Sequence, residues 1–326
     1  MRRREFIALL GAATAWPLLA HGQNTPAAVI GFVHSGSPEP AADAVAAFRG
    51  GLAALGYIEG LNLAIEYRWA HDDYDRLPAL LADVANRPVA LIAAAGGPVT
   101  ALAAKSVTTT LPILFSGVTD PVGSGLVASL NHPGGNITGT AGLTTELDPK
   151  RLEFLRELVP NVSRIGALIN PNRPDVNVQL KGLMAAAHGL GMEPVVLRAG
   201  NKRELEDLPQ VLREHQLQAV LVTADPFFVN QRKLLVSLMA QSSMPAMYQW
   251  RELVLDGGLI SYGASRSQAY YEAGVYAGRI LKGEKPAALP VLQPTKFELT
   301  INLKTARTLG LDVPSSLLAR ADEVIE

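Results

Sequence analysis

The 326-residue chain contains no cysteine, which excludes disulfide bonds, thiolate nucleophiles and metal sites with cysteine ligands. Charged residues make up only 18% of the chain and aromatic residues 6%, whereas 48% are hydrophobic. The formal net charge is -1, so the chain lacks the basic excess with which proteins neutralise nucleic-acid phosphates. The composition therefore indicates a globular protein with a large apolar core and no nucleic-acid partner.

Common enzyme motifs are missing as well. The sequence has no GxxxxGK[ST] phosphate loop, no HExxH zinc pair, no GxSxG nucleophile elbow and no SxxK motif. Its six histidines are scattered, so a metal site would have to be assembled wholly by folding. We therefore expect no metal, no cofactor and no catalysis. One alternative from another class stays open, an exported hydrolase or lyase that uses Asp120 or Asp225 as a general base.

The N-terminus has the layout of a signal peptide. Three arginines at positions 2–4 precede an apolar stretch over residues 6–20, which is too short and too weakly apolar to span a membrane comfortably. Ala20 and Gly22 offer small residues for cleavage before Gln23, so we expect residues 1–22 to be removed and the mature protein to be periplasmic. Residues 3–7 also resemble a twin-arginine export signal, and both this route and the Sec route stay open.

Short apolar runs alternate with helical patterns along the rest of the chain. Residues 27–33 and 89–94 are typical of buried strands, and residues 41–55 and 176–190 of helices. Two successive units of this kind predict an α/β fold with two doubly wound parallel-sheet lobes joined by a multi-strand hinge. Lobe 1 is expected over residues 27–144 plus 252–293, and lobe 2 over residues 145–251 plus 294–326. The chain is expected to cross between the lobes near residues 144–148, 248–252 and 293–296.

Ligands of open parallel sheets bind beyond the carboxyl ends of the strands, so the residues after each expected strand are the candidates for a site. In lobe 1 these are hydroxyls, glycines and one carboxylate: Ser35, Ser37, Gly96, Gly97, Thr100, Ser116 and Asp120. The glycines precede a helix start at Pro98, where unpaired N–H groups favour an anion such as a carboxylate. A plain strand-to-helix turn explains the same glycines, and Asp120 is equally typical of a turn cap.

The candidates in lobe 2 are Asn172, Asp225, Phe227, Tyr248 and Tyr262. Asp225 ends an expected strand beside two phenylalanines, where its carboxylate could pair with an ammonium group while an apolar part of the ligand lies on aromatic surface. Two alternatives stay open here. Asp225 also suits a helix cap ahead of Pro226, and aromatic residues are more often found in a core than facing a ligand.

Several of these stretches carry a resemblance to a known family. They are residues 95–98, 115–136, 170–172, 261–263, 281–283 and 289–291, followed by the block from residues 294–299 to 319–325. The chain resembles type I periplasmic solute-binding proteins of ABC transporters, in the tryptophan/tyrosine-type substrate-binding subfamily. Arg173, Pro174 and Asp175 depart from the small polar residues expected there, so the resemblance does not fix which solute is bound.

The resemblance implies a two-lobed protein of the Venus flytrap type with three strands crossing its hinge. Such a protein captures a small carboxylate-bearing solute, such as an amino acid or an aromatic acid, in the cleft between the lobes. It closes around the solute and presents it to an ABC permease in the inner membrane. We expect a monomer that catalyses no reaction. A sensory ligand-binding subunit for a membrane receptor is a further alternative, which differs in its partner and not in its fold.

Overall fold

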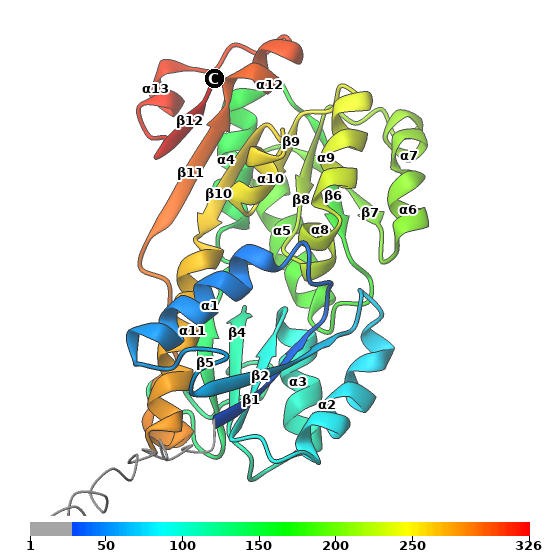
Figure 1. The fold of residues 1–326 in the computed structure, drawn as a ribbon. Coiled ribbons are helices and arrows are strands. Elements are labelled where there is room, and N and C mark those ends of the chain that lie inside the picture. The colour runs from blue at the N-terminus through cyan, green and yellow to red at the C-terminus, as the bar shows by residue number, and fades with distance from the viewer. Residues whose placement is uncertain (1–27) are drawn as a thin grey trace, which may run out of the picture.

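The computed structural model describes residues 28–326 and contains two α/β lobes, one above the other in Figure 1. The predicted fold class of two parallel-sheet lobes is therefore confirmed. The predicted signal peptide over residues 1–22 lies outside the described residues.

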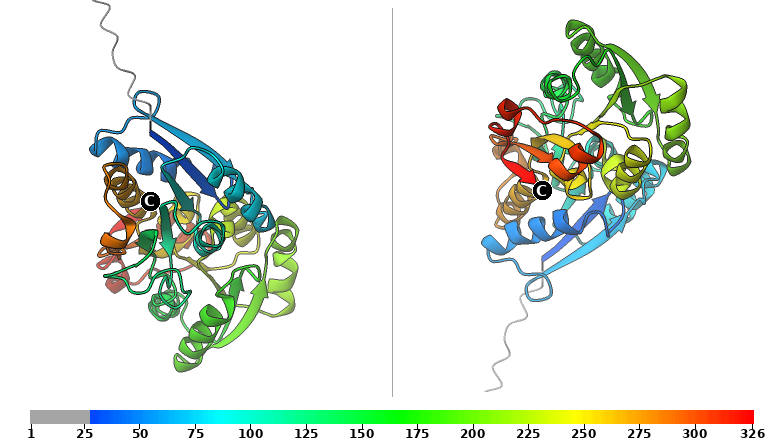
Figure 2. Two further views of the ribbon diagram at one scale, coloured as in Figure 1. Left: turned by 90° about the horizontal axis from the view of Figure 1, so that it is seen from below. Right: turned by 90° about the horizontal axis from the view of Figure 1, so that it is seen from above.

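Lobe 1 contains a five-stranded, all-parallel sheet in the order β2-β1-β3-β4-β5. Its strands are β1 (Ala28–His34), β2 (Leu63–Trp69), β3 (Leu91–Ala95), β4 (Ile113–Val118) and β5 (Ile137–Ala141). Its helices are α1 (Ala42–Ala54), η1 (Tyr74–Arg76), α2 (Leu77–Ala85), α3 (Pro98–Val107), α11 (Arg266–Leu281) and η2 (Pro286–Ala288). In Figure 2, α1 and α11 lie on one side of this sheet and α2 on the other. Burial on both faces explains why strand β3 consists entirely of buried apolar residues.

Helices α1 and α11 pack closely because glycines face each other where the helices meet. A Cβ atom at Gly51 of α1 would lie 2.0 Å from the backbone oxygen of Tyr271. A Cβ atom at Gly274 of α11 would lie 2.0 Å from the backbone oxygen of Phe48. Helix α11 thus belongs to lobe 1 although it follows a strand of lobe 2, and its N-terminus lies at the boundary between the lobes.

Lobe 2 contains a seven-stranded sheet in the order β12-β11-β10-β9-β8-β6-β7, parallel except for the pair β10–β11. Its strands are β6 (Arg164–Ile169), β7 (Glu193–Arg198), β8 (Ala219–Val222), β9 (Ala246–Tyr248), β10 (Ile260–Ala264), β11 (Phe297–Asn302) and β12 (Glu323–Ile325). Its helices are α4 (Asp148–Leu158), α5 (Val176–Gly189), α6 (Lys202–Glu206), α7 (Leu208–Glu214), α8 (Pro226–Asn230), α9 (Arg232–Gln241), α10 (Arg251–Leu255), α12 (Leu303–Thr308) and α13 (Ser315–Leu318).

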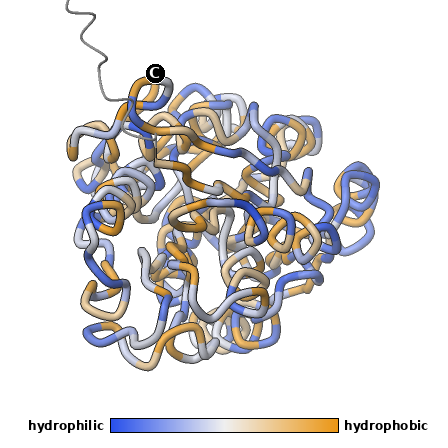
Figure 3. Tube along the Cα trace, turned by 60° about the horizontal axis from the view of Figure 1, so that its bottom comes forward, coloured by the Kyte–Doolittle hydropathy of each residue, from blue (hydrophilic) through white to orange (hydrophobic). Residues whose placement is uncertain are grey.

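Hydrophobic and hydrophilic stretches alternate along most of the trace in Figure 3, as expected where helices and strands bury one face. Each lobe contains two apolar clusters of buried side chains. In strand β9, for example, Met247 belongs to one cluster of lobe 2 and its neighbour Tyr248 to the other, because successive side chains of a strand point to opposite faces. Within residues 28–326, no helix combines the length and the apolar character that a membrane span requires.

The chain crosses between the lobes at three places. It leaves lobe 1 between β5 and α4, returns between β10 and α11, and leaves again between η2 and β11. The predicted crossing near residues 248–252 is wrong, because β10 is hydrogen-bonded to β9 and β11 in the sheet of lobe 2. Residues 252–264 therefore belong to lobe 2, and the second crossing lies at Ser265.

Candidate ligand-binding cavity

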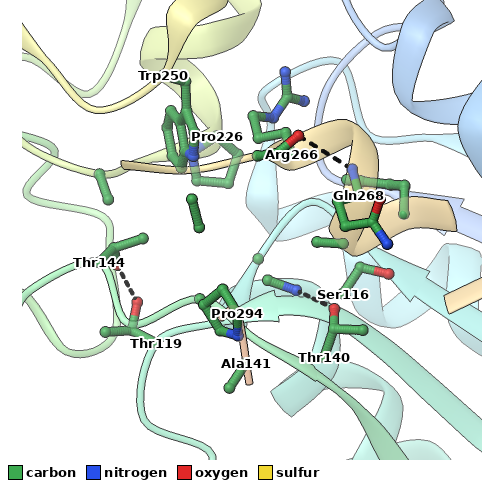
Figure 4. A pocket seen from close by; sticks show the side chains of 18 of the residues that line it. Ser116, Thr119, Thr140, Ala141, Thr144, Pro226, Trp250, Arg266, Gln268 and Pro294 are labelled. Carbon is green, nitrogen blue, oxygen red and sulfur yellow. Dashed lines mark hydrogen bonds between the residues drawn. The ribbon is translucent and has the colours of Figure 1, made fainter. Parts of the chain in front are cut away.

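A cavity of about 550 Å³ lies between the lobes, where the carboxyl ends of strands from both sheets meet. Lobe 1 lines it with residues that follow or end β1, β3, β4 and β5, and lobe 2 with residues that follow β6, β8, β9 and β10. The three crossing segments also contribute, for example through Gly142, Ser265 and Pro294. In Figure 4, Trp250 and Pro226 lie on one side of the cavity, and Ser116, Thr140 and Pro294 on the other.

The turn between β3 and α3 forms part of the lobe 1 wall. Gly96 and Gly97 have φ angles of 83° and 85°, in the left-handed region that favours glycine. The turn is fixed from behind, because Ser35 Oγ donates a hydrogen bond to the Gly96 oxygen at 2.8 Å. A Cβ atom at Gly97 would lie 3.0 Å from Pro226 of lobe 2, so glycine allows the lobes to approach here. Pro98 begins helix α3, whose first N–H groups lack helical partners.

A buried pair of side chains, His34 and Tyr270, lies beneath this turn and lines the cavity. Burial, and then the charge of Arg266, lowers the pKa of His34 to about 3, so its ring is neutral. The Gly36 N–H donates to His34 Nδ1 at 2.8 Å, which leaves the ring proton on Nε2. The Tyr270 hydroxyl oxygen accepts from that Nε2 at 3.3 Å and from the Gly96 N–H at 3.2 Å. Its own proton is therefore available to an acceptor in the cavity.

Asp225 places a buried carboxylate in the lobe 2 wall. Its Oδ1 accepts hydrogen bonds from the Phe227 N–H at 2.9 Å, from Asn170 Nδ2 at 2.8 Å and from the Tyr74 hydroxyl of lobe 1 at 3.0 Å. The contact with Phe227 caps the short helix α8. Burial raises the pKa of Asp225, against the nearby charge of Arg173 and the three hydrogen bonds. Asp225 is thus both a helix cap and part of the cavity wall.

Arg173 lies buried beside Asp225 and joins the two lobes. Its guanidinium contacts both oxygens of Asp175, at 2.5 Å and 2.9 Å, and donates to the Ala224 oxygen. It also donates to Thr119 Oγ1 of lobe 1 at 2.8 Å. The Asp175 contacts raise the pKa of Arg173 above its usual value although burial lowers it, so this side chain stays cationic. Within residues 28–326, no group of three His, Asp or Glu side chains could hold a metal ion.

Trp250 and Arg266 form the wall nearest the second crossing. Trp250 follows β9 in lobe 2, and Arg266 begins α11 in lobe 1. The Arg266 guanidinium carbon lies 5.8 Å from the centre of the Trp250 ring and 6.0 Å from that of Tyr270. Arg266 also pairs across the lobes with Glu252, at 3.5 Å. These contacts hold a flat aromatic surface at the edge of the cavity.

The structure brings four of the twelve predicted site residues together in the cavity: Gly96, Gly97, Ser116 and Asp225. Three further predicted residues lie behind the lobe 1 wall and support it. Ser35 holds the Gly96 oxygen, Ser37 Oγ lies 3.0 Å from His71 Nδ1, and Thr100 is buried in the first turn of α3. These three residues contribute to the shape of lobe 1. Contrary to the prediction, they do not line the cavity.

The other five predicted residues lie elsewhere. Asp120 and Asn172 are exposed. Asp120 Oδ1 accepts a hydrogen bond from the Gly123 N–H at 2.7 Å, so Asp120 caps a turn, which was the alternative interpretation of this residue. Phe227 and Tyr248 are buried in an apolar cluster of lobe 2, and Tyr262 packs edge-on against Phe154 at 5.1 Å. For these aromatic residues the core interpretation holds, because their rings point into the lobe rather than beyond the strand ends.

Sequence reasoning missed most of the cavity wall, including Thr119, Arg173, Trp250, Arg266 and Tyr270. Trp250 follows strand β9, so the strand-end rule could have found it. Arg266 follows β10 in the same way. Tyr270 lies one turn into a helix, and only the packing of α11 on lobe 1 places its hydroxyl beneath the Gly96 turn.

Comparisons with known proteins agree with this architecture. A family model described as ABC transporter substrate binding protein matches residues 11–325. A "Tyrosine-binding protein" of Clostridioides difficile (strain R20291) is 28% identical over 256 residues, which cover 78% of this chain and 73% of that protein.

Two solved structures are also similar. One is an ABC domain from Streptococcus pneumonia in complex with L-Trp, at 26% identity and a TM-score of 0.84, covering 92% of this chain and 100% of the other. The second is the ligand-free, open structure of a substrate binding protein with adhesive properties from Clostridium difficile. It matches at 24% identity with a TM-score of 0.64, covering 91% of this chain and 99% of the other.

Proposed function

The chain belongs to the family of ABC transporter substrate-binding proteins, and we propose that its solute is an aromatic amino acid bound as a zwitterion between the lobes. The observation that carries this proposal is the placement of complementary groups on opposite walls of one cavity. Lobe 1 offers the start of helix α3 and the Tyr270 hydroxyl, which suit a carboxylate. Lobe 2 offers the Asp225 carboxylate, which suits an ammonium group.

The remaining wall suits the side chain of such a solute. Trp250 and Pro226 give the cavity a flat apolar surface next to Asp225, on which an aromatic ring can stack (Figure 4). Two relatives support this ligand class, since one is described as tyrosine-binding and another was solved with L-Trp. A solute that contacts both lobes binds the closed arrangement better than the open one, so its binding energy drives hinge closure.

Binding of L-tryptophan or L-tyrosine should raise the melting temperature of the protein. A ligand at ten times its dissociation constant stabilises the folded state by about 1.4 kcal/mol. A thermal-shift series should include tryptamine, which lacks the carboxylate, and indole-3-propionate, which lacks the ammonium group. We expect both analogues to bind more weakly than the amino acid, since each leaves one wall without its partner. Equal shifts for all three compounds would refute recognition of a zwitterion.

We also propose that the mature protein is a periplasmic monomer that delivers its solute to a permease in the inner membrane. The sequence supports this through the arginines at positions 2–4, the short apolar stretch after them and the small residues Ala20 and Gly22. Mass spectrometry of the exported protein should find an N-terminus near Gln23. A full-length product retained in the cytoplasm would contradict the proposed location.

A further inference from the structure

A second set of contacts joins the lobes beside the cavity. Three consecutive residues of lobe 2, where α8 passes into α9, each donate a hydrogen bond to lobe 1. Asn230 Nδ2 donates to Asp72 Oδ1 at 2.6 Å, and Gln231 Nε2 donates to Asp72 Oδ2 at 2.9 Å. An Arg232 guanidinium nitrogen donates to the Pro40 oxygen at 3.1 Å. We refer to Asp72, Pro40 and residues 230–232 as the interlobe latch.

Lobe 1 holds Asp72 in position with its own contacts. His71 and Asp72 both adopt left-handed backbone conformations, with φ angles of 56° and 65°. This turn is fixed by hydrogen bonds from the His71 N–H to the Gly36 oxygen at 3.0 Å and from the Asp72 N–H to the Ser35 oxygen at 2.9 Å. Ser37 Oγ lies 3.0 Å from the His71 ring. Because all these contacts lie within lobe 1, the carboxylate can be presented in the same way before the lobes meet.

The latch surfaces fit each other only when the lobes are close. A Cβ atom at Gly36 would lie 1.9 Å from Asn230 Nδ2, so the backbone of lobe 1 approaches lobe 2 at a glycine. Each oxygen of Asp72 takes one amide donor, so the carboxylate exchanges water for two charge-assisted hydrogen bonds when the lobes meet. Asp72 and Gln231 do not line the cavity. Neither residue therefore contacts a solute in the cavity directly, and an equal effect on every solute would identify the position of the lobes as the route of their influence.

We propose that Asp72 is a positioning residue that stabilises the closed arrangement and thereby sets the affinity for the solute without touching it. The inference rests on the proposed function in one respect, namely that the closed arrangement is the one that holds the solute. A shift in the open–closed equilibrium multiplies the dissociation constant of every solute by the same factor. A residue that contacts the solute would instead change the ranking of solutes.

The distance between the lobes tests this proposal without a ligand. The chain has no cysteine, so Ala79→Cys in α2 and Gln210→Cys in α7 provide two specific spin-label sites on exposed helix faces. In Figure 1, α2 and α7 belong to different lobes, on the side away from β11 and α11. Pulsed electron paramagnetic resonance is recorded on the parent and on Asp72→Asn, Gln231→Ala and their combination. Asparagine suits the left-handed position, so this change removes the charge and keeps the turn.

We expect the parent to show a short-distance population without solute, and Asp72→Asn and Gln231→Ala each to reduce it. The double variant should lose little more than Asp72→Asn alone, because Gln231→Ala removes one of the two contacts that Asp72→Asn already weakens. Asp75→Asn is the matched control, since Asp75 is an exposed aspartate three residues away. A parent without the short distance, or an Asp72→Asn sample with the parent's distribution, would overturn the proposal. Both results can be obtained even if no amino acid binds, because the distances are measured without solute.

Affinity measurements separate a latch from a ligand contact. With L-tryptophan and L-tyrosine as probes, Asp72→Asn should raise both dissociation constants by the same factor, about tenfold for the weakened charge-assisted hydrogen bonds. We expect the higher dissociation constants to result from faster dissociation of the amino acid. A change in the ratio of the two constants would show that Asp72 acts on the solute itself. Failure of the parent to bind either probe would count against the proposed ligand class and leave the distance result to decide on the latch.

Discussion

Replacing Asp225 with asparagine should raise the dissociation constant of L-tryptophan by roughly one to two orders of magnitude. The amide keeps an oxygen that can cap the Phe227 N–H at 2.9 Å, but it no longer offers a negative charge to the ammonium group. A hydrogen bond to a charged group contributes about 1.5–3 kcal/mol, and each 1.4 kcal/mol is a factor of ten in affinity. Isothermal titration calorimetry on the parent and the variant measures the difference directly.

Two controls isolate the charge at Asp225 from its role as a cap. Asp120→Asn changes another aspartate that caps a turn, with a 2.7 Å contact to the Gly123 N–H, but this residue is exposed and lies outside the cavity. Its effect on binding should be negligible. Indole-3-propionate has no ammonium group, so the Asp225 variant should bind it as the parent does. If Asp225→Asn binds L-tryptophan as tightly as the parent, Asp225 is only a helix cap.

The pH dependence of binding follows from the same carboxylate. Burial raises the pKa of Asp225, so the group becomes protonated at a higher pH than an exposed aspartate would. The ammonium group of the amino acid stays charged on the acidic side of neutrality, and only the loss of charge at Asp225 removes their attraction. Affinity for the zwitterion should therefore fall on acidification through this raised pKa, and the Asn variant should lack that step.

The strand-end rule predicted four residues that line the cavity, but the aromatic residues that it predicted do not line it. Gly96, Gly97, Ser116 and Asp225 all follow or end parallel strands, and the rule depends only on the strand pattern. Tyr248 lies within strand β9, where side chains alternate between the two faces of the sheet. Its ring fills the core of lobe 2. The helices that cover each face decide which side is buried, and the local sequence does not contain that information.

The misplaced second crossing has a similar cause. The local sequence predicts a strand over residues 259–262 and a helix over residues 270–281, but it does not indicate which lobe each element joins. Strand β10 stays in lobe 2 because β11 pairs with it in antiparallel orientation. In this pairing Ala264 lies opposite Phe297, which is 33 residues later in the chain. Helix α11 joins lobe 1 because its small residues fit against α1. Both decisions depend on pairings that are distant in sequence.

One buried cation contacts the backbone next to the hinge. Arg151 of α4 is fully buried and donates to three groups: the Thr144 oxygen at 2.5 Å, the Asp148 Oδ1 at 2.7 Å and the Tyr262 oxygen at 2.7 Å. Thr144 belongs to the first crossing segment, and Tyr262 lies on β10, three residues before the second crossing at Ser265. A single guanidinium therefore connects the first crossing segment with the strand that leads into the second. Burial raises the pKa of Asp148, and the charge of Arg151 opposes this shift.

Arg151→Met should destabilise the protein by about 3–5 kcal/mol, because it leaves a buried carboxylate without its partner and two carbonyls without donors. Urea unfolding and the melting temperature measure the loss, which we expect to be on the order of 10 °C. Lys150→Met is the matched control. Its ammonium group pairs with Glu153 at 2.7 Å on the exposed side of the same helix, where an ion pair contributes about 0–1 kcal/mol.

Adding Asp148→Asn to Arg151→Met should recover part of the lost stability, since the second change removes the unpaired charge that the first one creates. The recovery should be incomplete, because the Thr144 and Tyr262 oxygens still lack the donors that Arg151 supplied. If Arg151→Met costs no more than Lys150→Met, the hinge does not depend on this cation. If the double variant recovers fully, the two carbonyl contacts contribute nothing, and the stabilising role of Arg151 reduces to neutralising Asp148.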